Sequence, residues 1–373
     1  MIACDICVVG AGIAGASLAG RLAADRSVVL LEREEHPGMH TTGRSVAIYT
    51  ETLLGVQIGP LTSASGAFFR RPPQGFSDTP LIRPRPVLQF GRADQFALLR
   101  QIQQGLHAAG AEGHWLDSDE ALALVPILRA DQAEGAVLDT AAFDMDVDAL
   151  HQGWLRRLRG AGGTLLTSAA FKGAAWSGGR WRITAGDSEI SAAVLVNAAG
   201  AWGDEVAVLA GVRPLGLQPR RRTVSVLATE PWAADPWPMA VNADNSLYFK
   251  PDAGRLLVSA MEQTPSPPCD AFADDMDVAE ALHRFAGVAT LPVRRPIRTW
   301  AGLRTFAPDG EPVAGYDPEH AGFFWLVGQG GSGIQTCPAL SETAAALVRH
   351  EPVPEDHAAF GVSAAALDPA RLR

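Results

Sequence analysis

The chain opens with a short apolar run, Ile6–Val9, that stops at Gly10. A run that is apolar at every position is typical of a parallel strand covered on both faces. Residues 16–24 then carry good helix formers without proline, and a second apolar run, Ser27–Leu31, stops at Glu32. This order of strand, glycine-rich turn, helix, strand and acid predicts a βαβ unit of the dinucleotide-binding type.

Hydrophobic periodicity predicts further elements along the chain. We expect helices at residues 94–109, from about Asp146 (or Asp148 as N-cap) to Leu158, and at 339–349. We expect strands at residues 164–167, 181–184, 188–190, 194–200 and 323–327. Alternating positions at residues 223–228, 246–250 and 255–260, separated by turn signals such as 251–254, predict an antiparallel sheet. Residues 45–90 show weak periodicity, and Pro84-Arg85-Pro86 favours extended backbone there.

The strands of nucleotide-binding type lie at the beginning, middle and end of the chain, with the antiparallel block between them. This predicts α/β plus α+β architecture, in which a Rossmann-like cofactor-binding domain is interleaved with an antiparallel-sheet substrate domain. We assign residues 1–80, 145–220 and 300–373 to the discontinuous cofactor-binding domain. Residues 81–144 and 221–299 then form the substrate-binding domain.

Composition and charge narrow the class of protein. The 373 residues are 47% hydrophobic and 19% charged, which is ordinary for a globular protein and argues against disorder. The net charge of −10 disfavours nucleic acid or an anionic membrane as a partner, although a local basic pocket remains compatible with it. No apolar run reaches membrane-spanning length, and the N-terminus has no basic, cleavable leader pattern. We therefore expect a cytoplasmic protein without a membrane span.

The four cysteines are too few for a disulfide scaffold. Cys4 and Cys7 form a CxxC pattern, but they lie in the opening strand and no second cysteine or histidine pair accompanies them. We interpret them as structural and expect no metal site. No Ser/His/Asp or Cys/His arrangement points to a nucleophilic mechanism.

The glycine-rich turn carries the first chemical signal. Gly10 and Gly12 would allow backbone N–H groups to approach a pyrophosphate, and Gly15 would bring the helix close to the strand. Glu32 lies 20 residues beyond Gly12, where a carboxylate can bind ribose hydroxyls, so NADP is disfavoured. A second glycine-rich helix start, Gly328–Gly333, suits the long FAD cofactor better than NAD.

Several segments together resemble the D-amino-acid oxidase-like family of FAD flavoenzymes, in its glycine oxidase and D-amino-acid dehydrogenase branch. Within that branch, the chain is most similar to the bacterial FAD-dependent D-arginine dehydrogenases. The segments are GAGIAGAS (10–17), LEREEHPGMHTTGRS (31–45), DALHQGWLR (148–156), AAVLVNAAGAW (192–202), RPLGLQPRRR (213–222), YFKPDAG (248–254), TWAGLRTF (299–306) and QGGSGIQT (329–336). The resemblance implies an FAD domain, a second domain that covers the flavin, and oxidation of an amine carbon by hydride transfer.

By position, the resemblance also implies which residues contact FAD. They are Gly10, Gly12, Ile13, Ala14, Gly15, Glu32, Arg33, Thr42, Gly43, Ser45, Ala199, Gly200, Trp202, Gly328, Gly330, Gly331, Gly333, Ile334, Gln335 and Thr336. His40 matches the family pattern just before this turn. Cys337 is a conceivable covalent anchor, but the near relatives hold FAD without a covalent bond, so we expect non-covalent FAD.

Three further positions match those that hold the substrate carboxylate in the family: Arg304, Tyr248 and Arg222. A guanidinium recognises a carboxylate in a bidentate manner and fixes its angle, and a tyrosine hydroxyl adds a directional hydrogen bond. Gly331 is expected beside the flavin or the substrate amine.

The departures from the arginine-using relatives concern the substrate side chain. Val87 stands where those relatives have an acid, Ile48 where they have histidine, and Leu53-Leu54 near a tyrosine of the active-site loop. A cationic side chain buried against these residues would be left unpaired, whereas an apolar one gains from burial. Glu51 on the same loop is the one residue that would restore a carboxylate.

We therefore expect FAD-dependent oxidation of a D-amino acid with an apolar side chain to the imino acid, then 2-oxo acid and ammonia. An N-methyl, cyclic or biosynthetic amino acid is an alternative substrate, and a non-catalytic flavin-binding protein is a further alternative. The electron acceptor, and the choice between oxidase and dehydrogenase, stay open. A monomer or homodimer is expected.

Overall fold

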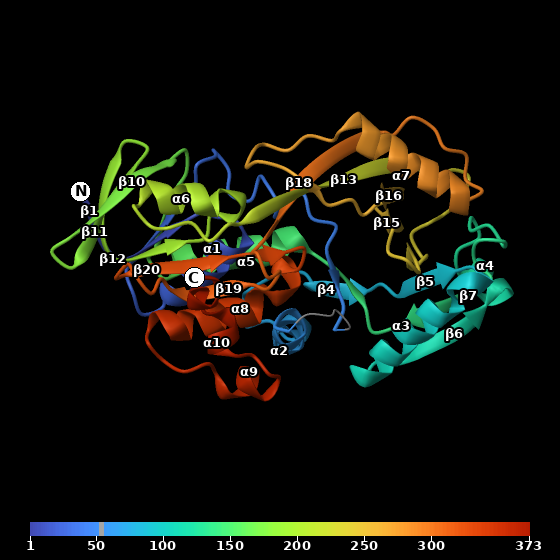
Figure 1. Ribbon diagram of the computed structural model, residues 1–373, viewed down its shortest axis with the longest axis horizontal. Coiled ribbons are helices and arrows are strands. Elements are labelled where there is room, and N and C mark those ends of the chain that lie inside the picture. The colour runs from blue at the N-terminus through green and yellow to red at the C-terminus, as the bar shows by residue number, and fades with distance from the viewer. Residues whose placement is uncertain (52–55) are drawn as a thin grey trace.

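The computed structural model describes residues 1–51 and 56–373 and has two lobes (Figure 1). Both chain termini lie in one lobe, which is built on a mostly parallel sheet with helices packed against it. The other lobe is built on a mostly antiparallel sheet. The chain passes repeatedly between the two lobes, as the sequence pattern predicts.

The first lobe contains a sheet with the strand order β10-β11-β12-β1-β2-β9. Its strands are β1 (Ile2–Val9), β2 (Val28–Leu31), β9 (Thr164–Leu166), β10 (Phe171–Ser177), β11 (Arg180–Ala185) and β12 (Ser188–Asn197), joined by β20 (Phe323–Val327) on β12 and β19 (Val313–Tyr316) on β20. Strand β1 pairs in parallel with both β2 and β12. The residues that follow these three strands therefore meet at one edge of the sheet.

Helices cover both faces of this sheet. On one face lie α1 (Ile13–Leu22), α2 (Ile58–Arg70), α5 (Val147–Gly160) and α8 (Gly333–Val348); on the other lies α6 (Gly203–Leu209), after the short helix η2 (Gly200–Trp202). Helix α5 contributes the fully buried Trp154, which stacks on Phe68 at 5.1 Å between ring centroids. The C-terminal segment adds α9 (Glu355–Ala359), α10 (Ala364–Leu367) and η3 (Pro369–Leu372).

The second lobe is built on a sheet with the order β21-β18-β13-β16-β15-β14-β5-β7-β6. Its strands are β5 (Val87–Gly91), β6 (Gly113–Asp117), β7 (Gly135–Asp139), β13 (Gln218–Ala228), β14 (Met239–Asn242), β15 (Tyr248–Asp252), β16 (Arg255–Ser259), β18 (Arg298–Phe306) and β21 (Gln329–Gly330), with β17 (Thr264–Pro265) on β13. Its helices are η1 (Ala93–Gln95), α3 (Phe96–Ala108), α4 (Ser118–Leu124) and α7 (Asp275–Val288).

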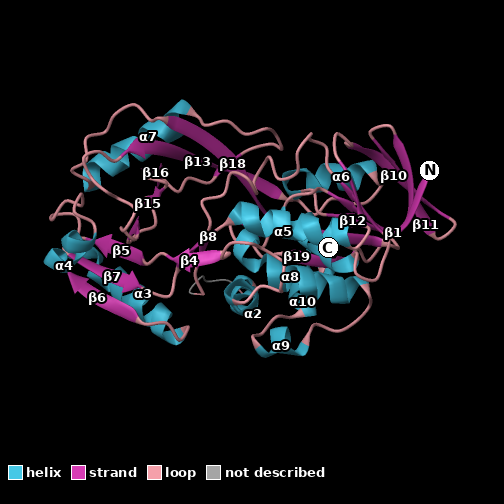
Figure 2. Ribbon diagram, turned by 180° about the vertical axis from the view of Figure 1, so that it is seen from behind, coloured by secondary structure: helices cyan, strands magenta, loops and turns pink. Residues whose placement is uncertain are grey.

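Helix α7 covers the outer face of β13 and β16 (Figure 2). Its Phe285 is fully buried and packs on Phe249 at 5.3 Å between ring centroids, and Asp277 accepts a 2.9 Å hydrogen bond from Arg221. Side chains alternate between the two faces of a strand, so the neighbouring Arg222 lies on the inner face. The inner face of β13 and β18 is therefore the one turned toward the first lobe.

A small sheet of β3 (Ile48–Tyr49), β8 (Phe143–Met145) and β4 (Ile82–Pro84) lies between the lobes (Figures 1 and 2). The predicted helix at 94–109 and the helix capped by Asp146 are confirmed, because Asp146 accepts a 2.9 Å hydrogen bond from the Ala149 N–H. Among the described residues, no helix is both long and apolar enough to cross a membrane.

Several elements differ from the sequence predictions. The strands predicted at 188–190 and 194–200 form one continuous strand, β12, because Ala192 pairs with both β1 and β11. This strand ends at Asn197, so residues 198–200 lie outside it. Helix α8 begins at Gly333 rather than near 339, since burial along most of its length outweighs the cost of the interior Pro338. Helix α2 lies within the segment of weak periodicity and was not predicted. The assignment of domain boundaries stays a prediction; strand β18 pairs with β13 in the second sheet.

Candidate functional site

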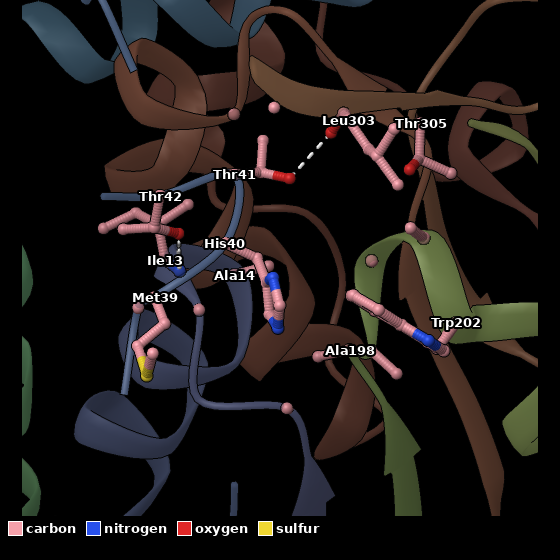
Figure 3. A pocket seen from close by; sticks show the side chains of 18 of the residues that line it. Ile13, Ala14, Met39, His40, Thr41, Thr42, Ala198, Trp202, Leu303 and Thr305 are labelled. Atoms are coloured by element: carbon pink, nitrogen blue, oxygen red, sulfur yellow. Dashed lines mark hydrogen bonds between the residues drawn. The ribbon is translucent and has the colours of Figure 1, made fainter. Parts of the chain in front are cut away.

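A cavity of about 370 Å³ lies between the lobes and is lined by residues of both sheets. It extends from the ends of β1, β2 and β12 to the inner face of β13 and β18 (Figure 3). Eighteen of the residues predicted for the site line it: Gly10, Gly12, Ile13, Ala14, Glu32, Arg33, Thr42, Ser45, Ala199, Gly200, Trp202, Gly330, Gly331, Gly333, Ile334, Arg222, Tyr248 and Arg304. Residues far apart in the sequence thus line one cavity.

The glycine-rich turn after β1 brings backbone against backbone. Gly10 has φ +101°, and an added Cβ there would lie 2.6 Å from the Ala198 oxygen, so only glycine fits. An added Cβ on Gly15 would lie 1.9 Å from the Gly10 oxygen, so the third glycine allows α1 to approach the turn. The result is a helix N-terminus that opens directly onto the cavity.

The N-terminus of α1 has the features of an anion site. Its N-cap Gly12 has no capping side chain, and its first turn contains no acid. The Thr42 hydroxyl accepts a 2.9 Å hydrogen bond from the Ile13 N–H (Figure 3). The positive end of the helix dipole favours a phosphate at this position.

Glu32, at the end of β2, is 7% exposed and lines the cavity. Its carboxylate accepts hydrogen bonds from the Ala11 N–H at 3.2 Å and the Glu34 N–H at 3.1 Å. Burial raises the pKa of Glu32, while these backbone N–H groups act in the opposite direction. The carboxylate is thereby fixed beside the turn, where it can accept hydrogen bonds from ribose hydroxyls.

Two loops meet above the glycine-rich turn, one after β2 and one after β12. His40 and Trp202 lie with ring centroids 4.7 Å apart (Figure 3). The Arg33 guanidinium lies 4.9 Å from the centre of the Trp202 ring. The His40 ring also makes a 2.9 Å hydrogen bond with the Glu34 carboxylate. Because β2 and β12 flank β1, these contacts cross above the turn between them.

The loop that contains His40 is tied to the second lobe. The Thr41 hydroxyl donates a 2.6 Å hydrogen bond to the Leu303 oxygen (Figure 3), and Arg44 donates to the Ala271 and Ala301 oxygens and pairs with Asp270. Arg44 lines the cavity but was not among the predicted site residues. Arg44 lies in the segment at 31–45 that carries the family resemblance, and this was the one feature of the sequence that could have marked it as a site residue.

Arg222 is 6% exposed and is held by two successive backbone oxygens. Its Nε donates to the Glu262 oxygen at 2.6 Å and its Nη2 donates to the Met261 oxygen at 2.8 Å. The third nitrogen, Nη1, is buried and has no hydrogen-bond partner among the described residues. Burial, together with the nearby charge of Arg304, lowers the pKa of Arg222 to about 10.

Arg304 lies on the same face as Arg222, because Arg222 is paired with Gly302, two residues before Arg304 on β18. A Cβ added to Gly331 would lie 3.2 Å from the Arg304 guanidinium carbon, so the glycine loop packs directly on that group. Within the described residues, no hydrogen bond or ion pair engages the Arg304 guanidinium. Two cationic side chains thus line one cavity, and among the described residues neither forms an ion pair with a carboxylate.

Tyr248 lines the cavity beside these arginines and is 4% exposed. Burial raises the pKa of its hydroxyl, so the phenol stays protonated and can donate a hydrogen bond. On its other side Tyr248 belongs to an apolar cluster that includes Val87 and, partly buried, Ile48 and Val46. Val46 lines the cavity too, so the cluster adjoins the cavity next to the arginines.

The other predicted residues that the structure describes do not line the cavity. Gly15 and Gly43 shape the turns beneath it, Gly328 has φ +77° before the last glycine loop, and Gln335 and Thr336 are buried in α8. Val87 and Ile48 reach it only through the apolar cluster, and Leu53 lies outside the described residues. Their roles stay predictions. The cavity lining also contains residues that were not predicted: Met39, Thr41, Ala169, Ala170, Phe171, Glu205 and Leu209.

Two alternative interpretations of single residues can be compared with the structure. Glu51 accepts hydrogen bonds from the Tyr49 hydroxyl at 2.8 Å and from Arg70 at 2.5 Å, so its carboxylate is already engaged. Cys337 is buried within α8 and does not line the cavity. In the described ranges, no group of acidic, histidine or cysteine side chains has the arrangement of a metal site.

Comparison with known proteins gives one family and several relatives. The model of the FAD dependent oxidoreductase family, DAO, matches residues 5–347. Hydrogen cyanide synthase subunit HcnC of Pseudomonas aeruginosa is 25% identical over 259 residues, which cover 66% of this chain and 58% of HcnC. The chain spans 43% and 58% of the lengths of the first curated relatives that it matches.

Solved structures share the fold over almost the full chain. Glycine oxidase from Geobacillus kaustophilus has a TM-score of 0.84 at 21% identity, covering 98% of this chain and 99% of that chain. L-proline dehydrogenase from P. horikoshii has a TM-score of 0.84 at 18% identity, covering 99% of this chain and 98% of that chain. The predicted fold class is confirmed.

Proposed function

Because the chain belongs to the FAD dependent oxidoreductase family, DAO, and is an FAD-dependent oxidoreductase, we propose that it oxidises a D-amino acid with an apolar side chain. The product is the imino acid, which water converts to the 2-oxo acid and ammonia. The hydrogen and electron pair of the amine carbon leave together as hydride, and the amine nitrogen loses one proton.

The described residues fit the cofactor. The glycines of the turn let the backbone approach a pyrophosphate closely, the N-terminus of α1 favours its charge, and the Glu32 carboxylate suits ribose hydroxyls. Thr42 and the loop at Gly331 lie along the same cavity. FAD, when bound, supplies the acceptor for a hydride from the substrate.

One observation carries the proposal: the buried guanidinium of Arg222 and that of Arg304 line the cavity, and neither forms an ion pair with a carboxylate of the described residues. The acids among the described lining residues, Glu32 and Glu205, come from the ends of β2 and α6 in the first lobe. A buried cation without a partner is costly, so this geometry favours an anionic ligand. A substrate carboxylate fits, because a guanidinium binds it through paired hydrogen bonds.

The chain's own residues would then bind and orient the substrate. Arg222 and Arg304 hold the carboxylate, and the protonated Tyr248 donates a further hydrogen bond. With the carboxylate fixed, the amine carbon has one orientation relative to the glycine loop at Gly331. Such positioning accounts for much of the rate in hydride transfer from an amine. The apolar cluster beside Tyr248 excludes water from the side-chain end.

The preference for an apolar side chain rests on the surroundings of Val87. The two nearest carboxylates in strand register are already engaged. Asp139, opposite Val87, accepts hydrogen bonds from the Ala141 N–H at 2.8 Å and the Thr50 hydroxyl at 3.1 Å. Asp144, opposite Ile48, pairs with Arg85 and Lys250, each at 2.7 Å. Neither of these two carboxylates lines the cavity, so a cationic substrate side chain there would meet apolar groups.

The test is steady-state kinetics of the holoenzyme with an artificial electron acceptor. We expect D-leucine, D-methionine and D-phenylalanine to exceed D-arginine and all L-isomers in kcat/KM. Glycine and L-proline belong in the panel because the similar solved structures are named for them, and N-methyl amino acids test the alternative substrate class. A preference for D-arginine would contradict the side-chain argument, and a preference for glycine, L-proline or L-leucine would contradict the proposed substrate.

The variant Val87→Glu gives a gain-of-function control. It places a carboxylate in the apolar cluster, which should raise the D-arginine to D-leucine ratio of kcat/KM by about tenfold or more, because the cationic side chain then has a partner. The matched control Leu138→Glu lies on β7 and packs, partly buried, against the apolar cluster on the other face of the sheet, so it tests for a nonspecific effect of added charge. An unchanged ratio in Val87→Glu would show that Val87 does not face the substrate.

A further inference from the structure

The turn after β16 contains a non-glycine residue in the left-handed region. Met261 has φ +56°, two residues beyond the end of the strand at Ser259. Long side chains rarely adopt this conformation, and when they do, the strain concentrates at functional sites. The backbone and the side chain of Met261 make separate contacts, one with Arg222 and one with an apolar cluster.

The backbone of Met261 helps to hold Arg222. The Met261 oxygen accepts from Nη2 at 2.8 Å and the Glu262 oxygen accepts from Nε at 2.6 Å. Successive carbonyls of an extended strand point in opposite directions. Two neighbouring carbonyls can hold one guanidinium only where the strand is broken, and the left-handed residue breaks it. The two oxygens carry no formal charge, and Nη1 has no hydrogen-bond partner in the described structure. The nearby Glu262 carboxylate favours the charged form of Arg222 and so acts against burial on its pKa, but among the described residues it makes no ion pair with the guanidinium.

The side chain of Met261 has a separate contact. It packs, partly buried, against the apolar cluster that contains Val87, Val241 and Tyr248. Methionine is unbranched and polarisable, so it fills irregular apolar space. One residue therefore contacts both the group that would bind the substrate carboxylate and the apolar surface that would receive the substrate side chain.

We propose that Met261 is a positioning and specificity residue: its left-handed backbone sets the orientation of Arg222, and its side chain forms part of the pocket for the apolar substituent. This proposal rests on the proposed function. Two substitutions separate the two roles. Met261→Gly keeps the left-handed backbone but removes the side chain, whereas Met261→Val keeps an apolar side chain that is strongly disfavoured in this conformation.

A matched control is available at Ala253, which has φ +47° in the β15–β16 hairpin turn. This turn lies at the opposite end of the hairpin from Tyr248, which pairs with Ser259. The variant Ala253→Val introduces a β-branched residue into a left-handed turn without touching Arg222. It reports the effect of such strain on folding alone.

The experiment measures carboxylate binding to each holoenzyme through the perturbation of its flavin absorption spectrum. Acetate probes the carboxylate contact, and 4-methylpentanoate adds an apolar chain. For Met261→Val we expect the Kd of acetate to rise about tenfold, with little change in the ratio of the two Kd values. For Met261→Gly we expect acetate binding within about twofold of wild type and a loss of about fourfold or more in the preference for 4-methylpentanoate.

The outcomes distinguish the proposals. If Met261→Val binds acetate as wild type does, or no more weakly than Ala253→Val, the positioning role is wrong. If Met261→Gly keeps the full preference for 4-methylpentanoate, the specificity role is wrong. If wild-type holoenzyme binds neither carboxylate, the proposed function is wrong and the proposal for Met261 is wrong with it. If Met261→Val fails to fold, the Kd of acetate for Met261→Gly tests the positioning role instead. A Kd close to that of wild type supports the proposal, and a tenfold higher Kd overturns it.

Discussion

Replacing Arg304 by methionine should abolish most turnover without destabilising the protein. The Arg304 guanidinium faces the cavity and lacks a protein partner in the described residues, so its hydrogen-bonding capacity is available to a substrate carboxylate. Two hydrogen bonds to a charged group contribute about 1.5–3 kcal/mol each. At about 1.4 kcal/mol per factor of ten, Arg304→Met should lower kcat/KM for D-leucine by about a thousandfold.

The stability of the same variant should change little, and in the opposite sense. Arg304 and Arg222 carry like charges, and this proximity contributes to the lowered pKa of Arg222. Removing one charge relieves this repulsion, so the free energy of unfolding in urea should stay equal or rise slightly. Arg221→Met is the matched control: its guanidinium pairs with Asp277 at 2.9 Å and Asp274 at 3.3 Å on the outer face.

We expect Arg221→Met to lose about 1 kcal/mol of stability while keeping kcat/KM within about threefold of wild type. The reasoning would be refuted by an Arg304→Met variant that retains kcat/KM within threefold of wild type. It would also be refuted if Arg304→Met lost as much stability as Arg221→Met, because Arg304 would then be a structural residue.

Three further predictions concern the cofactor site and the scaffold. Glu32→Ala should raise the Kd for FAD about tenfold or more, measured by fluorescence of released FAD, because a charged acceptor for ribose hydroxyls is lost; an unchanged Kd would contradict this role. Gly15→Ala should yield little folded, FAD-binding protein, since the new Cβ would lie 1.9 Å from a backbone oxygen. The control Gly105→Ala, which has open space around it in α3, should raise the melting temperature. Equal melting temperatures of the two variants would contradict the packing argument. Burial opposes the ionisation of Asp317, but hydrogen bonds such as that from Trp325 at 3.0 Å outweigh burial and lower the pKa of Asp317 below 3.8. The ionised carboxylate therefore stabilises the fold above pH 3.8, and this stabilisation is lost as the pH falls through the lower folded-state pKa. The difference in stability between wild type and Asp317→Asn should narrow at acid pH, and a constant difference would contradict this.

The cofactor end of the site was largely predictable because its information is local. The turn at Gly10, the helix after it and Glu32 lie within one short βαβ unit, and each glycine has a specific steric reason. The apolar run that stops at Glu32 is enough to predict that this acid lies at the end of the second strand. The same topology explains why Ala169–Phe171 line the cavity: they follow β9, the next parallel strand, whose position the sequence pattern predicts.

The substrate end was not derivable from local pattern. Arg222 and Arg304 share a face because β13 and β18 pair in one register, and a slip of one residue would turn one of them outward. Register of this kind depends on contacts between distant segments, so only the family resemblance pointed to these residues. The role of Met261 was invisible for the same reason, since nothing in the sequence around it signals a left-handed conformation.

Helix α2 shows a related effect within the first lobe. Its sequence contains glycine, serine and threonine at interior positions, which weakens the helical pattern. In the structure, the Thr62 and Ser65 hydroxyls donate hydrogen bonds of 2.7 Å to backbone oxygens four residues earlier, and Ser65 also accepts from the Ala339 N–H of α8. Packing against α8 thus stabilises a helix whose intrinsic propensity is low.

The central claim is that a D-amino acid with an apolar side chain reduces the flavin. Anaerobic mixing of the holoenzyme with D-leucine, followed at the visible absorption band of oxidised flavin, tests it most directly. We expect rapid and complete bleaching with D-leucine, much slower bleaching with D-arginine, and none with L-leucine. An oxidised flavin spectrum that persists with D-leucine, or that bleaches fastest with D-arginine or L-leucine, would contradict the account.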